Sequence, residues 1–161
     1  MAKEKKTNAM RMLERAKISY KEHEYECEEF TDGLTSTLKT GIEPERSFKT
    51  LVTKGKSGGY YVLVIPVAEE VDFKKAAKAA GEKSIEMIHV KELTPLTGYV
   101  RGGCSPIGMK KQFPTILHAS ALDHDTIVIS GGRIGLSLEL APNDLITLVR
   151  AKVADIIHSA D

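Results

Sequence analysis

"RSFKTLVTKGKSGGYYVLVIPV", residues Arg46–Val67, is the stretch of sequence that decides the fold. It reads as a strand, a turn and a second strand. The turn lies at Gly55–Gly59, where glycines let the chain reverse its direction. The second strand, Tyr60–Val67, is nearly all apolar, so we expect it to be buried. The sequence therefore predicts a hairpin with one strand inside the core.

Upstream of the hairpin the sequence predicts two helices and a strand. The first helix has one apolar stripe, and the strand alternates roughly in polarity. The short second helix should end at Gly41, a residue that suits a left-handed cap. These elements are a helix capped by Thr7 or Asn8 that runs to about Lys17, a partly exposed strand over residues 18–27, and a short helix over about residues 34–40.

Downstream of the hairpin an alanine-rich helix is predicted, with Asp72 as its N-cap and Gly81 at its end. Residues 85–90 fit either a strand or a short helical piece, because periodicity does not decide between them. A short helix is expected near residues 91–93.

Three strands are then predicted in succession, in "PTILHAS", "DTIVISG" and "GLSLEL". Pro142 suits the first turn of a final helix over about residues 142–149. Because helices and strands follow one another in mixed order, we expect an α+β fold with a mixed, mostly antiparallel sheet. The length of 161 residues predicts a single domain over residues 1–161.

Composition limits the functional classes. The formal net charge is +1, so the chain lacks the global basic field of a DNA-coating protein. No apolar run follows the start "MAKEKKTNAM", and none elsewhere is long enough to cross a bilayer. Cys27 and Cys104 could form at most one disulfide. We therefore expect a cytoplasmic protein with no DNA or membrane partner, whose RNA contacts come from a local patch.

Several motifs have a simple structural interpretation. "KGKSGG", residues 54–59, lacks the glycine that a Walker loop needs five residues before its Gly-Lys pair, so a hairpin turn is the better interpretation. The histidines and cysteines show no metal-ligand spacing, so we expect no bound metal and no cofactor. The "DHD" at residues 123–125 is typical of a solvated turn between two strands rather than a catalytic base.

Two single residues can each be interpreted in two ways. Cys104 lies between glycines and a proline, so it could be a nucleophile with a lowered pKa or a semi-buried structural residue. The sequence identifies no base near it, which favours the structural role. Lys49 shares a strand face with Ser47 and Leu51, so it lies either at a rim, with its ammonium group in water, or in a cleft. Composition alone favours the rim.

Two glycine-rich loops are candidates for ligand contact. One is Gly102–Gly108 and the other is Ser130–Gly135. Glycine lets a ligand approach main-chain N–H and C=O groups closely, and such groups bind carbonyls, phosphates and oxyanions. Two tight turns are the simpler interpretation.

Three motifs together resemble the YbaK-type proteins, the bacterial trans-editing Cys-tRNA(Pro) deacylases related to the editing domain of bacterial prolyl-tRNA synthetase. They are "RSFKTLV", "GGCSPIGMKK" and "ISGGRIGLSLELAPNDLI", at residues 46–52, 102–111 and 129–146. The resemblance covers nearly the whole chain. It implies a curved sheet flanked by helices, hydrolysis of the aminoacyl ester at the acceptor 3′ end of mischarged tRNA, and a complex with prolyl-tRNA synthetase.

The same resemblance implies the residues of the site. The family's essential lysine falls on Lys49, and its G-x-x-x-P loop falls on Gly102 and Pro106. Tyr25 looks like the aromatic of the family's H-x-Y segment, and Ser130 matches a serine before a glycine pair. The full set of substrate contacts that the resemblance implies is Tyr25, Phe30, Thr50, Gly102, Gly103, Pro106, Ser130, Gly131 and Ser137.

The chain departs from many members of the family at two positions. Asp32 stands where an aromatic residue precedes the glycine placed at Gly33, with Phe30 two residues earlier. Ser137 stands where aspartate is common. These departures bear on the amino-acid specificity more than on the reaction class, because the family also contains deacylases for other mischarged tRNAs, notably Ala-tRNA(Pro).

The main functional hypothesis is a deacylase in which Lys49, the Gly102–Pro106 loop and Ser130 position the ester. The substrate's own thiol then attacks, as is thought for the family. One alternative is a non-catalytic module that binds aminoacyl-tRNA or a small acyl ligand, and another is a hydrolase that depends on Cys104. RNA phosphates are expected to meet the basic side chains Lys3, Lys5, Lys6, Arg101, Lys110, Lys111 and Arg133.

Overall fold

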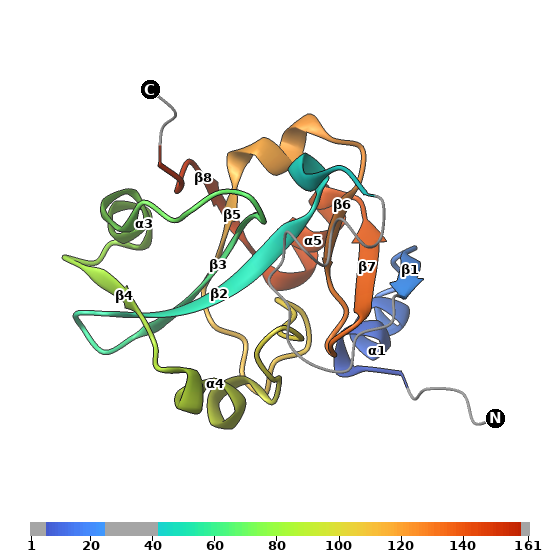
Figure 1. Ribbon diagram of the computed structural model, residues 1–161, viewed down its shortest axis with the longest axis horizontal. Helices are drawn as coiled ribbons and strands as arrows, with labels where there is room; N and C mark the ends of the chain where they lie inside the picture. Colours follow the sequence, from blue (N-terminus) through green and yellow to red (C-terminus); the bar gives the residue numbers. More distant parts are fainter. Residues whose placement is uncertain (1–5, 25–41, 159–161) are drawn as a thin grey trace.

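The computed structural model describes residues 6–24 and 42–158 (Figure 1). The helices are α1 (Asn8–Arg15), α3 (Phe73–Ala80), α4 (Val90–Thr97) and α5 (Pro142–Val149), with 3-10 segments η1 (Pro44–Arg46) and η2 (Ala119–Asp123). The strands are β1 (Lys21–Glu24), β2 (Phe48–Gly55), β3 (Tyr60–Pro66), β4 (Ile85–Met87), β5 (Thr115–His118), β6 (Ile127–Ser130), β7 (Leu136–Leu140) and β8 (Lys152–Ala154). The helix expected near residues 34–40 lies outside the described residues, as does the end of the strand expected over residues 18–27.

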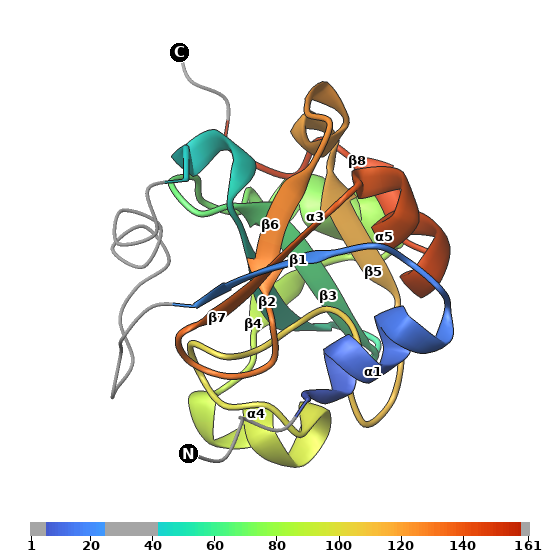
Figure 2. The same cartoon turned by 90° about the vertical axis from the view of Figure 1, so that its right-hand side faces the viewer.

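The described strands form two sheets. The larger has the order β4-β2-β3-β5-β8 and the smaller has the order β1-β7-β6. Neighbouring strands are antiparallel except for β3–β5 and β5–β8, which are parallel. The α+β class and the mostly antiparallel pairing are confirmed, but the strands divide into two sheets, linked by a parallel bridge between Ser47 and Val128. Figure 2 shows the smaller sheet in front of the larger one.

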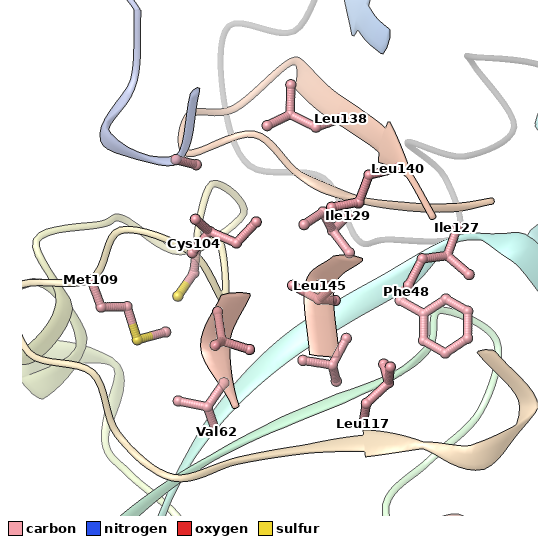
Figure 3. Packing of buried hydrophobic residues seen from close by; sticks show 14 of the residues in the cluster. Phe48, Val62, Cys104, Met109, Leu117, Ile127, Ile129, Leu138, Leu140 and Leu145 are labelled. Carbon is pink, nitrogen blue, oxygen red and sulfur yellow. The ribbon is translucent and has the colours of Figure 1, made fainter. Parts of the chain in front are cut away.

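Strand β3 is buried on both faces, as its apolar sequence predicts. Val62 and Val64 belong to the main core, whereas Leu63 and Ile65 belong to a smaller core with residues of α3. All four are 0% exposed. Successive side chains of a strand point to opposite faces, so a strand between two cores needs an uninterrupted apolar run. Figure 3 shows the main core, in which side chains of both sheets and α5 meet.

Local signals define the helix ends as the sequence predicts. Thr7 Oγ1 accepts the Met10 N–H at 3.2 Å and so caps α1. Asp72 Oδ1 accepts two main-chain N–H groups in the first turn of α3, and Gly81 ends that helix with a φ of 76°. Pro142 begins α5. These caps satisfy helix-end groups that would otherwise lack partners.

Two elements go beyond the sequence prediction. α4 continues to Thr97 through Pro95, although the sequence predicts a helix only near residues 91–93. Its ends are well defined, because Glu92 accepts the N–H of the residue before the helix at 2.9 Å and Gly98 is left-handed. β8 is too short to show a periodic pattern, and its pairing with β5 depends on an edge that the tertiary structure provides.

Candidate functional site

Lys49, Ser130 and Ser137 lie on one face of neighbouring strands. β2 and β6 are joined by the parallel bridge between Ser47 and Val128. Lys49 and Ser130 each follow two residues after these bridge partners, and residues two apart on a strand share a face. Ser130 in turn pairs with Ser137 of β7. Three of the expected site residues are therefore brought together from three strands.

This face of the smaller sheet is the polar one. Ile129, Leu138 and Leu140 alternate with the two serines, are at most 1% exposed and belong to the main core (Figure 3). Ser130 and Ser137 are half-buried on the opposite side. A ligand on this side would meet hydroxyl groups and the Lys49 side chain rather than the core. We call it the polar face.

Lys49 carries a charge that the described part of the chain does not neutralise. It is half-buried, and no described carboxylate or hydrogen-bond acceptor pairs with it. Arg46, three residues earlier, differs because Glu43 and Glu139 hold it at 2.7 Å and 3.0 Å. A partly desolvated cation without a counter-charge attracts an anion or a carbonyl oxygen. Lys49 can therefore bind a phosphate or ester oxygen of a ligand.

Thr50 lies on the opposite, core-facing side of β2. It pairs with Val64, a residue of the main core. Its Oγ1 is buried and has no hydrogen-bond partner, a feature it shares with Ser120 Oγ within the described part of the chain. The structure thus separates the Thr50 side chain from that of Lys49, and a contact between Thr50 and substrate stays a prediction.

The two glycine-rich loops pack against each other, main chain to main chain. Gly102 has a φ of 86°, in the left-handed region that favours glycine. A Cβ added at Gly103 would lie 2.8 Å from Arg133 Cα and 2.9 Å from Ile134 N. A residue other than glycine would force these backbones apart. Since the second loop begins at Ser130, the contact brings the first loop to the end of the polar face.

Hydrogen bonds inside the first loop do not use the adjacent main-chain N–H groups of Cys104 and Ser105. The Gly103 N–H donates to Val100 O at 2.9 Å. The Ile107 N–H donates to Ser105 Oγ at 3.2 Å. The N–H groups of Cys104 and Ser105 have no acceptor among residues 6–24 and 42–158. Ser105 is completely buried, so of these two N–H groups only that of Cys104 can meet a carbonyl oxygen or an oxyanion of a ligand.

Buried contacts hold both loops in place. Pro106 is buried and restricts the backbone of the first loop. The Tyr99 hydroxyl donates to Ile107 O at 2.6 Å, and burial raises the pKa of Tyr99 to about 12. In the second loop, Gly131 O accepts the Thr7 hydroxyl at 2.6 Å. Both loops are therefore held in place by contacts within the protein itself.

Cys104 is part of the core. It is 8% exposed and packs in the main core with Met109 (Figure 3). Burial raises the pKa of its thiol to about 12. A thiol that stays protonated at neutral pH is a poor nucleophile. The structure thus supports the structural role of Cys104 over the nucleophilic one.

Glu139 joins the two chain segments that flank residues 25–41. His23 of β1 lies 2.8 Å from Oε1, and Arg46 of η1 lies 3.0 Å from Oε2. Thr126 Oγ1 donates to Oε2 at 2.5 Å. The Thr126 bond, with those from His23 and Arg46, lowers the pKa of Glu139 to about 2. Sequence reasoning missed this cluster because its members are far apart along the chain and share no motif.

Three residues that the sequence analysis connects with the site, Tyr25, Phe30 and Asp32, lie outside the described residues. Among the residues that are described, no three or more His, Cys, Asp or Glu side chains are grouped so that they could hold a metal ion. No helix in the same part of the chain has the length and apolarity that crossing a membrane requires.

The sequence profile of the aminoacyl-tRNA editing domain matches residues 31–148. The chain belongs to the aminoacyl-tRNA editing-domain family. The protein EbsC of Enterococcus faecalis is 50% identical over 160 residues, which cover 97% of this chain and 98% of EbsC. Its name describes a candidate Cys-tRNA(Pro)/Cys-tRNA(Cys) deacylase. The resemblance to YbaK-type proteins is confirmed.

Solved structures share the fold of this editing-domain protein. A candidate trans-editing enzyme for prolyl-tRNA synthetase superposes with a TM-score of 0.81 at 23% identity, covering 94% of this chain and 96% of that one. The hypothetical protein APE2540 superposes with a TM-score of 0.84 at 22% identity, covering 94% and 99%. At such low identity these similarities establish the fold alone.

The contact between the glycine loops predicts the effect of a methyl group. Gly103→Ala should lower the free energy of unfolding by about 1–3 kcal/mol, because the new Cβ would overlap the main chain of the second loop. Gly59→Ala is the matched control, since a Cβ there would be no closer than 3.6 Å to its neighbours. Urea unfolding followed by circular dichroism measures both. Equal losses in the two variants would contradict the main-chain contact.

The lowered pKa of Glu139 predicts a pH-dependent stability. Because its folded pKa of about 2 lies below the ordinary 4.5, the carboxylate stabilises the fold fully above about pH 4.5 and loses its effect as the pH falls towards 2. Glu139→Gln should therefore be less stable than the natural protein at neutral pH, and the difference should shrink in acid. Unfolding curves at several pH values measure this difference in stability. Glu86→Gln is the control, because it removes an exposed carboxylate. A difference that is independent of pH would refute the role of this carboxylate.

The burial of Cys104 predicts slow alkylation. Iodoacetamide at pH 8 should label Cys104 in the native protein more than about tenfold more slowly than in urea, because the thiol is protonated and covered. Peptide mapping by mass spectrometry reports Cys104 separately from Cys27. Equal labelling rates in native and unfolded protein would show that the thiol is accessible.

Proposed function

We propose that this chain, as one editing domain over residues 1–161, hydrolyses the aminoacyl ester of mischarged tRNA, with Cys-tRNA as the substrate. The observation that carries the proposal is the 50% identity to EbsC along almost the whole of both chains. The geometry supports it, because the polar face offers a cation at Lys49 and the first glycine loop offers a main-chain donor at Cys104. Ester hydrolysis needs donors of this kind for the oxyanion that develops.

Catalysis would come from positioning and electrostatics. The aminoacyl ester is already activated, and correct positioning can supply about 7–11 kcal/mol in favourable systems. We assign the Cys104 N–H group to the developing oxyanion, where one donor is worth roughly 3–4 kcal/mol in well-studied enzymes. We assign the Lys49 ammonium to a phosphate or ester oxygen of the terminal nucleotide, with Ser130 and Ser137 beside it.

The nucleophile would be the thiol of the substrate itself. Its sulfur attacks the ester carbonyl, a carbon–sulfur bond forms, the ester carbon–oxygen bond breaks, and the ribose oxygen leaves with a proton. Water then opens the cyclic thioester and releases free cysteine. The burial of Cys104, with its pKa of about 12, supports this route because it makes the protein's own described thiol a poor candidate.

Recognition of the tRNA body would be weak. Arg101, Lys110, Lys111 and Arg133 lie in or beside the two loops, but the net charge of the chain is only +1 and Arg133 already pairs with Glu24 at 3.4 Å. Few phosphate contacts give weak binding that depends strongly on salt. We therefore propose that prolyl-tRNA synthetase forms a complex with this protein and delivers Cys-tRNA(Pro). The complex would act in the cytoplasm, where aminoacyl-tRNA is made.

The decisive variant is Lys49→Ala. We expect hydrolysis of Cys-tRNA(Pro) to fall by about 10²-fold or more, because the cation that orients the ester is lost. Lys56→Ala is the matched control, since Lys56 is an exposed lysine in the turn after the same strand. Release of free cysteine from charged tRNA is the measurement. Full activity of Lys49→Ala would refute the role of this residue.

The substrate is tested with a panel of Cys-tRNA(Pro), Cys-tRNA(Cys) and Ala-tRNA(Pro), with and without the synthetase. We expect release of cysteine and little release of alanine. Release of alanine alone would show that the protein removes alanine rather than cysteine from tRNA. Retardation of tRNA on a gel without release of any amino acid would favour a binding module over a deacylase.

A further inference from the structure

His23 lies on the polar face, in the same row as the two serines of the candidate site. β1 lies beside β7, and His23 pairs directly with Ser137 (Figure 1). Ser137 pairs in turn with Ser130 of β6. Directly paired residues of antiparallel strands send their side chains to the same face of a sheet. His23 therefore extends the row of serines onto a third strand, which lies about 4.8 Å from the second.

The end of β1 also adjoins the two glycine loops. Glu24, the last residue of β1, accepts a hydrogen bond from Arg133 of the second loop at 3.4 Å. Gly103 of the first loop packs on the main chain of the same arginine. Cys104, whose N–H group is assigned to the oxyanion, is the next residue. His23 and this donor are therefore close to one contact between the loops.

The Glu139 carboxylate orients the His23 ring. His23 Nε2 lies 2.8 Å from Glu139 Oε1. Hydrogen bonds from Thr126, His23 and Arg46 lower the pKa of Glu139 to about 2, so at neutral pH this group is a carboxylate that only accepts hydrogen bonds. A neutral His23 ring must therefore donate from Nε2, which leaves the lone pair on Nδ1. A carboxylate orients the imidazole in this way in enzymes that use histidine as a base.

The Nδ1 atom of His23 is left for a ligand. It has no hydrogen-bond or ion-pair partner among residues 6–24 and 42–158. The side chain is 24% exposed, so a ligand can reach it. Arg46 and Thr126 contact the other oxygen of Glu139 and do not occupy the ring.

His23 is also the one group of this face, within the described ranges, that suits proton transfer. The charged side chains around it are Glu139 of β7, Arg46 of η1, Lys49 of β2 and Lys21, which lies two residues earlier on the same face of β1. Lysine and arginine are ordinarily cations at neutral pH, and a carboxylate with a pKa of about 2 is a very weak base. The imidazole is therefore the candidate base.

Attack by the thiol of the substrate needs a base of this kind. An ordinary cysteine thiol has a pKa of about 8.5 and is mostly protonated at neutral pH, whereas the nucleophile is the thiolate. The ribose oxygen that leaves must in turn receive a proton. A single group that takes the first proton and gives it to the leaving oxygen serves both needs.

We propose that His23 is the general base of the deacylation and that Glu139 is its positioning residue. Nδ1 takes the proton of the substrate thiol as the sulfur forms its bond to the ester carbon. The Nδ1–H group then gives this proton to the ribose oxygen as the ester carbon–oxygen bond breaks, and the ring ends neutral. This inference rests on the proposed deacylation and supplies its carrier of the proton.

His23→Gln is the variant that tests the base, because a glutamine amide can still donate to Glu139 but cannot take up a proton. At pH 7 the kcat for Cys-tRNA(Pro) should fall by about 10²-fold with little change in KM, since general bases contribute on this scale. His158→Gln is the matched control and should keep the natural rate. His158 is exposed and also lies beside a carboxylate, that of Asp72 at 3.6 Å.

The dependence on pH distinguishes a base from a residue that only supports the fold. The substrate thiol ionises without help above about pH 8.5, so the loss in His23→Gln should shrink at least about fivefold between pH 7 and pH 9. Hydrolysis without protein is subtracted at each pH, and circular dichroism verifies that the variant is folded. The same loss at both pH values, or full activity of the variant at pH 7, would overturn the proposal.

The ring can also be observed in the natural protein, without any variant. In ¹⁵N NMR spectra at pH 8, His23 Nε2 should have the shift of a protonated nitrogen and Nδ1 that of an unprotonated one. The opposite tautomer would overturn the positioning by Glu139. If the natural protein releases no cysteine, the deacylase proposal itself fails. If it releases cysteine and His23→Gln is equally fast, only the role of His23 fails.

Discussion

Strand β2 is the element on which the rest of the structure depends, because it lies in the larger sheet and the residue just before it, Ser47, is bridged to the smaller sheet. One edge pairs with β3, and the other meets β4 at one end and β6 at Ser47. One of its faces sends Phe48 and Val52 into the main core, while Leu51 on the other face packs against the smaller core. Lys49 shares the face of Leu51 but lies at the end that adjoins β6. The hydrophobic packing of one strand therefore positions the cation of the candidate site.

Charge divides the surface into regions with different tasks. Glu139 is neutralised by Arg46 and bonded by two other side chains, so its role is to join segments of the fold. Lys49 is left without a counter-charge in the described part of the chain, which suits a site for phosphate and ester oxygens. A polyanion such as tRNA is attracted to an unpaired cation such as Lys49.

Much of the fold could be predicted because its signals are local. Alternation and apolar runs identify the β2–β3 hairpin, and single residues such as Asp72 and Gly81 mark helix ends. The three motifs that place Lys49 and the two glycine loops in a known family are likewise stretches of contiguous sequence. The division into two sheets and the strand β8 could not be predicted, because edge pairing between distant segments leaves no local pattern.

The sequence by itself determined which residues can do chemistry: a lysine on a strand, and glycines that let main-chain groups approach a ligand. Only the tertiary structure decided which of them meet. It packs Gly103 on the main chain of Arg133, buries the Cys104 thiol, and gathers Glu139 with three partners from distant segments. The physical reason is that burial and hydrogen bonding depend on neighbours in space, and the packing of the two cores brings those neighbours together.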